Sequence, residues 1–165
     1  MGVYDHKKQA TLPVRCKIVT VSDTRTYETD KSGQIIHEQL QQADIIVAAY
    51  EIVKDDVFAI RKAVQIKEQV DVILINGGTG FTKRDVTIEA IQPLLEKEMV
   101  GFGELFRFLS YEQIGSAAML SRALAGSMNN MMVFCMPGST NAVRLAMEKL
   151  ILPEIRHLVW ELRRQ

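Results

Sequence analysis

The stretch that most constrains the fold is residues 70–90, VDVILINGGTGFTKRDVTIEA. An apolar run at 70–75 ends abruptly in the glycine-rich segment 76–80, and a helical pattern begins soon after Asp85. This order predicts a buried strand, a glycine loop and the start of a helix. Proteins with α/β folds build anion sites at such junctions, because backbone N–H groups and a helix N-terminus point at the same spot.

Strand-like and helical apolar patterns alternate along the first half of the chain. We expect strands at residues 17–21, 45–53 and 70–75, and helices at 34–43, from 57 onward and through 90–95. Either Asp55 or Asp56 is a suitable N-cap for the second helix. The alternation predicts an α/β fold, with a mostly parallel sheet covered by helices on both faces.

The second half of the chain adds a hairpin and further helices. Apolar spacing predicts a helix at 101–115, and the short apolar runs 123–128 and 131–136 are separated by Asn129-Asn130. Because asparagine tolerates positive φ, this spacing predicts a β-hairpin with one antiparallel strand. Pro153 is expected to interrupt the last helical stretch, as the first-turn proline of a final helix.

The overall composition excludes several classes of protein. Lysine and arginine number 20 and so do aspartate and glutamate, so no basic excess indicates a nucleic-acid or membrane partner. No run approaches the roughly 18 apolar residues of a membrane span. We expect a cytoplasmic protein with a polar, mobile tail at residues 1–12 and a single domain at 13–165.

Polar or glycine-rich loops follow four of the expected strands. Their residues are Ser22 and Asp23; Asp55 and Asp56; Gly77, Gly78, Thr79 and Gly80 with Asp85; and Pro137, Gly138 and Ser139. Ligands of open α/β sheets bind outside the carboxyl ends of the strands, so these loops should meet at one edge. Glycine lets a phosphate approach the backbone, and carboxylates beside a phosphate require a cation such as Mg²⁺. A nucleoside triphosphate with magnesium fits these parts.

Each feature also has an interpretation without a ligand. A lone GGTG sequence can be a tight turn, and it lacks the Gly-Lys-Ser/Thr of a P-loop. Asp85, Asp55 or Asp56, and Ser139 could serve only as helix N-caps. Glu104 could be half of a surface ion pair.

Several motifs occur together in a characteristic order. NGGTG, RDVT and EA lie within 76–90, and GFGELFR, SRALAG and MPGST follow at 101–107, 121–126 and 136–140. SDTR at 22–25 and VKDD at 53–56 complete the pattern. Together they resemble the MoaB/MogA family of molybdenum cofactor biosynthesis proteins, whose domain also occurs in the plant Cnx proteins and gephyrin. The resemblance extends from about Arg15 to the C-terminal helix.

The resemblance implies a three-layer α/β/α domain that assembles as a homo-trimer or homo-hexamer. It implies binding of molybdopterin, an anionic pterin dithiolene with a terminal phosphate. Catalytic members transfer AMP from Mg-ATP to that phosphate and release pyrophosphate. A later enzyme inserts molybdate, and it is a further expected partner.

The resemblance also implies roles for individual residues. Asp85 of RDVT would hold Mg²⁺ and orient the α-phosphate, with Asp55 as the second carboxylate. Lys54 stands where the family has proline, so Asp56 competes for that role. The glycine loop would bind phosphate at Gly78, Thr79 and Gly80. The residues that would line the pterin and nucleotide pocket are Ser22, Glu104, Ser121, Pro137, Gly138 and Ser139.

Two functions are compatible with these motifs. The first is a molybdopterin adenylyltransferase, which the paired carboxylates and phosphate-type loops favour. The second is a non-catalytic molybdopterin carrier or scaffold, which the substitution at Lys54 leaves open.

Overall fold

The computed structural model describes residues 13–66 and 69–164, so the tail predicted at residues 1–12 lies outside the described residues. Within these residues, six strands form one sheet in the order β2-β1-β3-β6-β5-β4. The strands are β1 (Arg15–Val21), β2 (Ile46–Val53), β3 (Val72–Asn76), β4 (Lys97–Glu98), β5 (Leu124–Met128) and β6 (Met131–Met136). Strands β2, β1, β3 and β6 are parallel to one another, whereas β5 and β4 join in antiparallel pairs.

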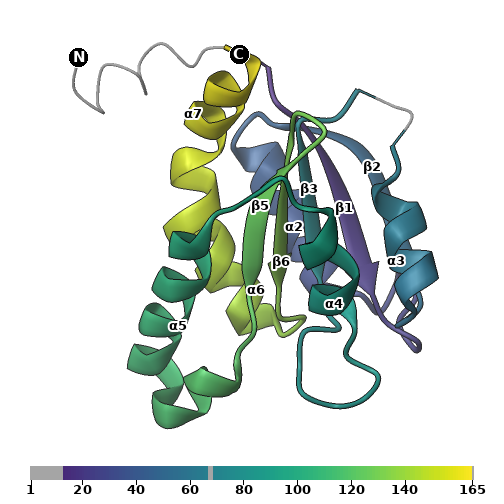
Figure 1. Cartoon of the computed structure of the whole chain (residues 1–165), viewed down its shortest axis with the longest axis vertical. Coiled ribbons are helices and arrows are strands. Elements are labelled where there is room, and N and C mark those ends of the chain that lie inside the picture. The colour runs from purple at the N-terminus through teal and green to yellow at the C-terminus, as the bar shows by residue number, and fades with distance from the viewer. Residues whose placement is uncertain (1–12, 67–68, 165) are drawn as a thin grey trace.

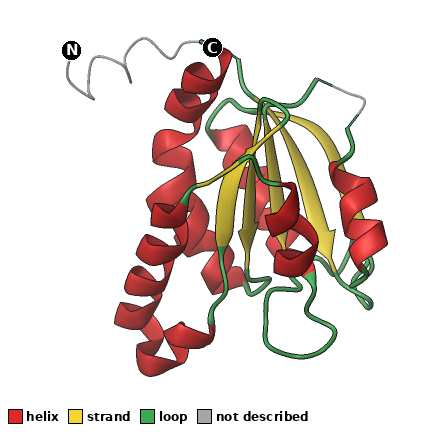
Figure 2. Cartoon of the chain, viewed as in Figure 1, coloured by secondary structure: helices red, strands yellow, loops and turns green. Residues whose placement is uncertain are grey.

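Helices cover both faces of this sheet, so the chain has the expected three-layer α/β/α arrangement (Figures 1 and 2). The helices are α2 (Lys31–Gln42), α3 (Val57–Val64), α4 (Thr87–Ile91), α5 (Val100–Ile114), α6 (Thr140–Ala146) and α7 (Leu152–Arg163). Shorter turns are the 3₁₀ segments η1 (Gln92–Leu94) and η2 (Gly115–Leu120) and the π segment η3 (Met147–Ile151).

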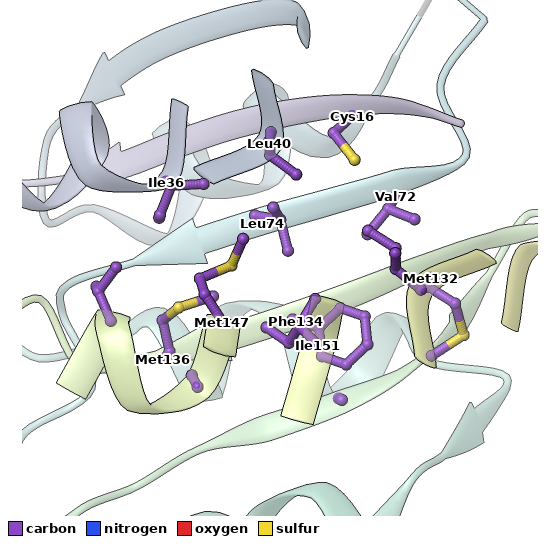
Figure 3. Packing of buried hydrophobic residues seen from close by; sticks show 14 of the residues in the cluster. Cys16, Ile36, Leu40, Val72, Leu74, Met132, Phe134, Met136, Met147 and Ile151 are labelled. Carbon is purple, nitrogen blue, oxygen red and sulfur yellow. The ribbon is translucent and has the colours of Figure 1, made fainter. Parts of the chain in front are cut away.

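Successive strand residues point to opposite faces of the sheet and build two separate cores. Ile18 and Leu74 pack with α2, α5, α6 and α7, while Val19 and Ile75 pack with α3 and α4. Figure 3 shows part of the first cluster, in which Leu74 and Phe134 come from adjacent strands. Residues 72–75 of β3 and 132–136 of β6 are buried on both faces, and both runs are continuously apolar, as is typical of parallel strands.

The predicted hairpin is confirmed. Asn129 and Asn130 adopt φ angles of 49° and 60°, and β5 pairs antiparallel with β6. Since β6 also pairs in parallel with β3, the hairpin attaches an antiparallel edge to a parallel sheet. The end of β6 therefore lies beside the end of β3, next to the glycine loop.

Three details of the helices differ from the sequence-based expectation. Helix α2 begins three residues earlier than the predicted 34, because Asp30 caps it by accepting a hydrogen bond from Gly33 N–H at 3.1 Å. The third helix ends at Ile91 and tightens into η1, which contains Pro93. Pro153 does lie in the first turn of α7, but it does not interrupt the helical stretch, because η3 joins α6 to α7 without a gap.

Candidate active site

A pocket of about 490 Å³ opens at the carboxyl edge of the parallel strands, towards which the arrowheads in Figure 2 point. Its walls come from the loops after β1, β2, β3 and β6 and from the segment before β5. The lining residues are Val21, Ser22, Thr24, Arg25, Asp55, Gly77, Gly78, Thr79, Gly80, Asp85, Leu120, Ser121, Arg122, Pro137 and Gly138. The four predicted loops thus meet at one edge, as their topology requires.

The floor of the pocket is the glycine loop after β3. Gly77 and Gly78 have φ angles of +94° and +66°, a conformation that other residues rarely adopt. Thr87 holds this loop from the start of α4. Its hydroxyl donates to the Gly77 carbonyl at 2.8 Å, and its N–H donates to the Gly78 carbonyl at 2.9 Å. Thr87 therefore holds the loop in place, and Gly77 and Gly78 line the pocket with backbone and no side chains.

Two carboxylates lie against this loop. A β-carbon built on Gly78 would lie 3.0 Å from Asp55 Oδ1, and one built on Gly80 would lie 2.7 Å from Asp85 Oδ2. A side chain at Gly80 would displace Asp85, and one at Gly78 would displace the Thr87 hydroxyl and crowd Asp55. The absence of side chains therefore makes room for both acids beside exposed backbone.

Asp85 does not cap the following helix. Its Oδ2 accepts hydrogen bonds from Thr82 N–H at 2.9 Å and Thr82 Oγ1 at 2.6 Å, while the N-cap position of α4 is Val86. These hydrogen bonds from Thr82, aided by the charge of Arg122, lower the pKa of Asp85 despite some burial. Asp85 is thus an ionised carboxylate held in a fixed orientation at the pocket wall.

Asp55 has the opposite electrostatic environment. Burial is the largest cause of its raised pKa. The nearby negative charges of Asp23 and Asp85 raise the pKa further, and the positive charge of Arg84 lowers it. Asp23 accepts the Asp55 N–H at 3.2 Å and is itself paired with Arg84. Carboxylates that lie this close together repel one another, so binding of a proton or a cation among them is favoured.

Some predicted site residues do not line the pocket. Asp56 is the N-cap of α3 and accepts from Ala59 N–H at 2.8 Å, so Asp55 is the acid of this pair that faces the pocket. Ser139 is the exposed N-cap of α6. Glu104 is exposed on α5, and Asp23 contacts the backbone of Asp55 without lining the pocket.

Two arginines that the sequence did not single out as site residues line the pocket. Arg122 ties the glycine loop from the opposite side, donating from Nε to the Thr79 carbonyl at 2.9 Å and from Nη2 to the Gly80 carbonyl at 2.7 Å. It also pairs with Glu89 and lies over the Phe81 ring, 5.3 Å from its centroid. The only signal for Arg122 in the sequence is its place directly after Ser121.

Arg25 joins two of the loops. Its Nη2 donates to the Gly138 carbonyl at 3.0 Å, and its Nη1 donates to Asp30 at 3.3 Å and to Ser32. Ser22 fixes the approach to this residue, since its hydroxyl accepts from Arg25 N–H at 3.1 Å. The sequence signal for Arg25 is its place in SDTR.

The residues present can hold one hard divalent cation together with a phosphate. Among residues 13–66 and 69–164, no three His, Cys, Asp or Glu side chains are grouped as a self-sufficient metal site. Mg²⁺ needs fewer protein ligands, because it uses one or two carboxylates and completes its shell with phosphate oxygens and water. Asp55 and Asp85 both line the pocket and could serve as these carboxylates. Burial and then the negative charges of Asp23 and Asp85 raise the pKa of Asp55, and a cation would offset those charges.

Comparisons with known proteins give a consistent result. Residues 17–157 match the family model described as "Probable molybdopterin binding domain". The chain is 64% identical over 169 positions to molybdenum cofactor biosynthesis protein B of Bacillus cereus, with 100% of both chains covered. A crystal structure of a molybdenum cofactor biosynthesis protein B, also 64% identical, matches with a TM-score of 0.91 over 95% of this chain and 100% of that one.

A more distant solved structure has the same fold. The tungsten cofactor synthesizing protein MoaB from Pyrococcus furiosus is 39% identical and matches with a TM-score of 0.81, over 92% of this chain and 98% of that one. In the part of the chain that the structure describes, none of the helices has the length and hydrophobicity required to cross a bilayer.

Proposed function

The chain belongs to the family of probable molybdopterin-binding domains and has a role in molybdenum cofactor biosynthesis; from this premise we propose that it is a molybdopterin adenylyltransferase. It would transfer AMP from Mg-ATP to the terminal phosphate of molybdopterin and release pyrophosphate. The observation that carries the proposal is the placement of Asp55 and Asp85 against the glycine loop, beside Gly78 and Gly80.

The charges around the pocket support a substrate that arrives with a metal ion. Arg25 is paired with Asp30, and Arg122 is paired with Glu89. Asp55 and Asp85 form no ion pair within 13–66 and 69–164, so Arg84 and Arg122 offset their negative charge only in part. These acids would repel a free polyphosphate, whereas a Mg²⁺ ion would be shared between the carboxylates and the phosphate oxygens.

In the reaction, an oxygen of the pterin phosphate attacks the α-phosphorus of ATP. The new oxygen–phosphorus bond forms as the bond to the pyrophosphate oxygen breaks, so no covalent enzyme intermediate is needed. The attacking phosphate is already an anion, and little general-base work is required. Charge neutralisation and in-line positioning therefore dominate the barrier.

The chain's own residues supply orientation in this scheme. Asp85, fixed by Thr82 and ionised, would hold Mg²⁺ together with Asp55. Bound Mg²⁺ would neutralise charge on the triphosphate. Gly78 and Gly80 line the pocket without side chains, so a phosphate can come close to the backbone.

We also propose that the chain self-associates as a trimer or hexamer. An exposed apolar set on α5 and η2 supports this, and it consists of Val100, Leu105, Phe108, Tyr111, Ile114, Met119 and Leu120. Patches of this kind commonly mark contact surfaces. Sedimentation equilibrium of the wild-type protein and of Phe108→Glu tests the proposal, because a monomeric wild type would refute it.

Thermal unfolding with added ligands separates the enzyme from a carrier. A ligand that binds the native state at about 100 times its Kd stabilises it by about 2.7 kcal/mol. An adenylyltransferase gains stability from Mg-ATP as well as from molybdopterin, and the Mg-ATP effect disappears in Asp85→Asn or when EDTA replaces magnesium. Stabilisation by molybdopterin alone would assign the chain to the carrier class.

A further inference from the structure

Arg25 has hydrogen-bond donors that the protein does not use. Both hydrogens of Nη1 are taken by Asp30 and Ser32, and one hydrogen of Nη2 is taken by the Gly138 carbonyl. No residue within 13–66 and 69–164 accepts from Nε or from the second Nη2 hydrogen. The Arg25 side chain is 33% exposed and lines the pocket. A planar guanidinium with two free N–H groups is suited to a phosphate.

The other side of Arg25 is held by a buried polar network. Asp30 is fully buried and accepts hydrogen bonds from Tyr50 Oη at 2.5 Å and Gly33 N–H at 3.1 Å as well as from Arg25. Ser32, also fully buried, bonds to Asn76 at 2.9 Å. Burial would raise the pKa of Asp30, but its hydrogen bonds lower it overall, so the carboxylate is ionised. The buried, ionised Asp30 carboxylate therefore holds one edge of the Arg25 guanidinium in place.

The Arg25 guanidinium is packed against the glycines of the loops after β3 and β6. A β-carbon on Gly138 would lie 3.6 Å from Arg25 Nη1 and 3.0 Å from Gly77 Cα, so Arg25 is packed where the loops after β3 and β6 meet. No ion pair joins it to Asp55 or Asp85 in the described part of the chain. A phosphate at Arg25 would be held by N–H donors and backbone and would not need the metal ion that the carboxylates require.

We propose that Arg25 forms a metal-independent phosphate subsite for the phosphate monoester of the acceptor, and that the buried Asp30 is its positioning residue. The identity of the acceptor rests on the proposed function. The subsite explains how one pocket can bring two phosphates together. One is held by a guanidinium, and the other is held through Mg²⁺ at Asp55 and Asp85. Their separate means of neutralisation lower the repulsion between the two anions.

Equilibrium dialysis with ³²P-labelled inorganic phosphate in EDTA tests the subsite. The wild-type protein should bind phosphate, and Arg25→Gln should bind it about tenfold or more weakly, since charge-assisted hydrogen bonds are lost. Arg25→Lys keeps the charge but loses the planar fork, so its affinity should fall between the two. Arg164→Gln removes the same charge from an exposed residue of the chain's last turn and should bind as the wild type does.

The positioning role of Asp30 has its own readout. Asp30→Asn and, if that variant unfolds, Ser32→Ala should weaken phosphate binding while Arg25 is intact. Asp55→Asn should bind phosphate in EDTA no more weakly than the wild type, because it removes a repulsive charge. No binding in EDTA, or equal binding by Arg25→Gln and wild type, would overturn the proposal.

Competition identifies the occupant. With Mg²⁺ in place of EDTA, molybdopterin should displace the labelled phosphate that depends on Arg25, whereas Mg-ATP should not. Displacement of this phosphate by Mg-ATP would overturn the assignment to the acceptor. The outcome is separable from the proposed function. A protein that binds phosphate through Arg25 but never adenylylates molybdopterin retains the subsite and loses only the transferase activity.

Discussion

The Asp55 carboxylate lies against the backbone of Gly78, so closely that a β-carbon on this glycine would lie 3.0 Å from Asp55 Oδ1. The two residues come from loops after different strands, β2 and β3. Their proximity places an acid directly beside a phosphate-type loop, and it makes the geometry of the acid dependent on the absence of a side chain.

Gly78→Ala should therefore damage both stability and activity. The new β-carbon would meet Thr87 Oγ1 as well as Asp55, at a φ of +66°. A non-glycine residue in such a conformation costs roughly 1–3 kcal/mol, which urea unfolding measures. The crowded Asp55 carboxylate would have to shift by a few tenths of an ångström, and the rate of adenylyl transfer should fall because in-line positioning depends on this wall of the pocket.

Gly101→Ala is the matched control for this substitution. Gly101 lies near the start of α5, and a β-carbon there would meet nothing within 4 Å. Alanine should stabilise the helix by roughly 0.5–1 kcal/mol and leave activity unchanged. Equal destabilisation by the two substitutions would contradict the role given to Gly78.

Asp55→Asn should stabilise the protein at neutral pH while it weakens function. An acid whose pKa is raised by folding destabilises the native state when it is ionised, and this effect disappears once it is protonated. The gain of Asp55→Asn, about 1 kcal/mol or less, should be present at pH 7. It should fade as pH falls through the raised pKa of Asp55 towards the ordinary value near 3.8.

Thermal unfolding of the wild type and Asp55→Asn from pH 7 to pH 3 measures the difference. Asp56→Ala serves as the control, because Asp56 caps α3 and loss of its side chain should destabilise the protein. A wild type more stable than Asp55→Asn at pH 7 would show that Asp55 is stabilised by partners and not strained by neighbouring acids.

Arg122→Lys should loosen the glycine loop. Lysine cannot reproduce the fork that bonds the Thr79 and Gly80 carbonyls and Glu89 together. Hydrogen exchange of residues 79–86 should accelerate, while the core strands keep their protection. Glu89→Gln should produce a smaller change of the same kind, and unchanged exchange in Arg122→Lys would show that the loop is held by Thr87 alone.

Much of the fold could be predicted because its strands are short, apolar and regularly separated by helical patterns. The hairpin could be predicted equally well, since Asn129 and Asn130 mark the turn directly. The edge strand β4 was missed, because two exposed residues, Lys97 and Glu98, carry no strand pattern. The continuous helix through Pro153 was missed because the π segment that precedes it depends on packing in the core.

The sequence predicted the loops of the site but not the roles of its two arginines. Strand topology alone placed the acids and glycines at one edge. Arg25 and Arg122 act through contacts with Gly138 and Thr79, which are 113 and 43 residues away in sequence. No local pattern encodes such contacts. The burial of Asp30 was likewise hidden, because TDKSG has the composition of an ordinary polar loop.

The most direct measurement is transfer of label from ATP labelled at its α-phosphate to molybdopterin in the presence of Mg²⁺. The wild type should produce labelled adenylyl-molybdopterin and pyrophosphate. Asp85→Asn should fold and bind molybdopterin but lose at least about 100-fold in rate, since it loses a fixed carboxylate at the reacting phosphates. No transfer by a wild type that binds molybdopterin, or transfer by Asp85→Asn at the wild-type rate, would contradict the function proposed for this pocket.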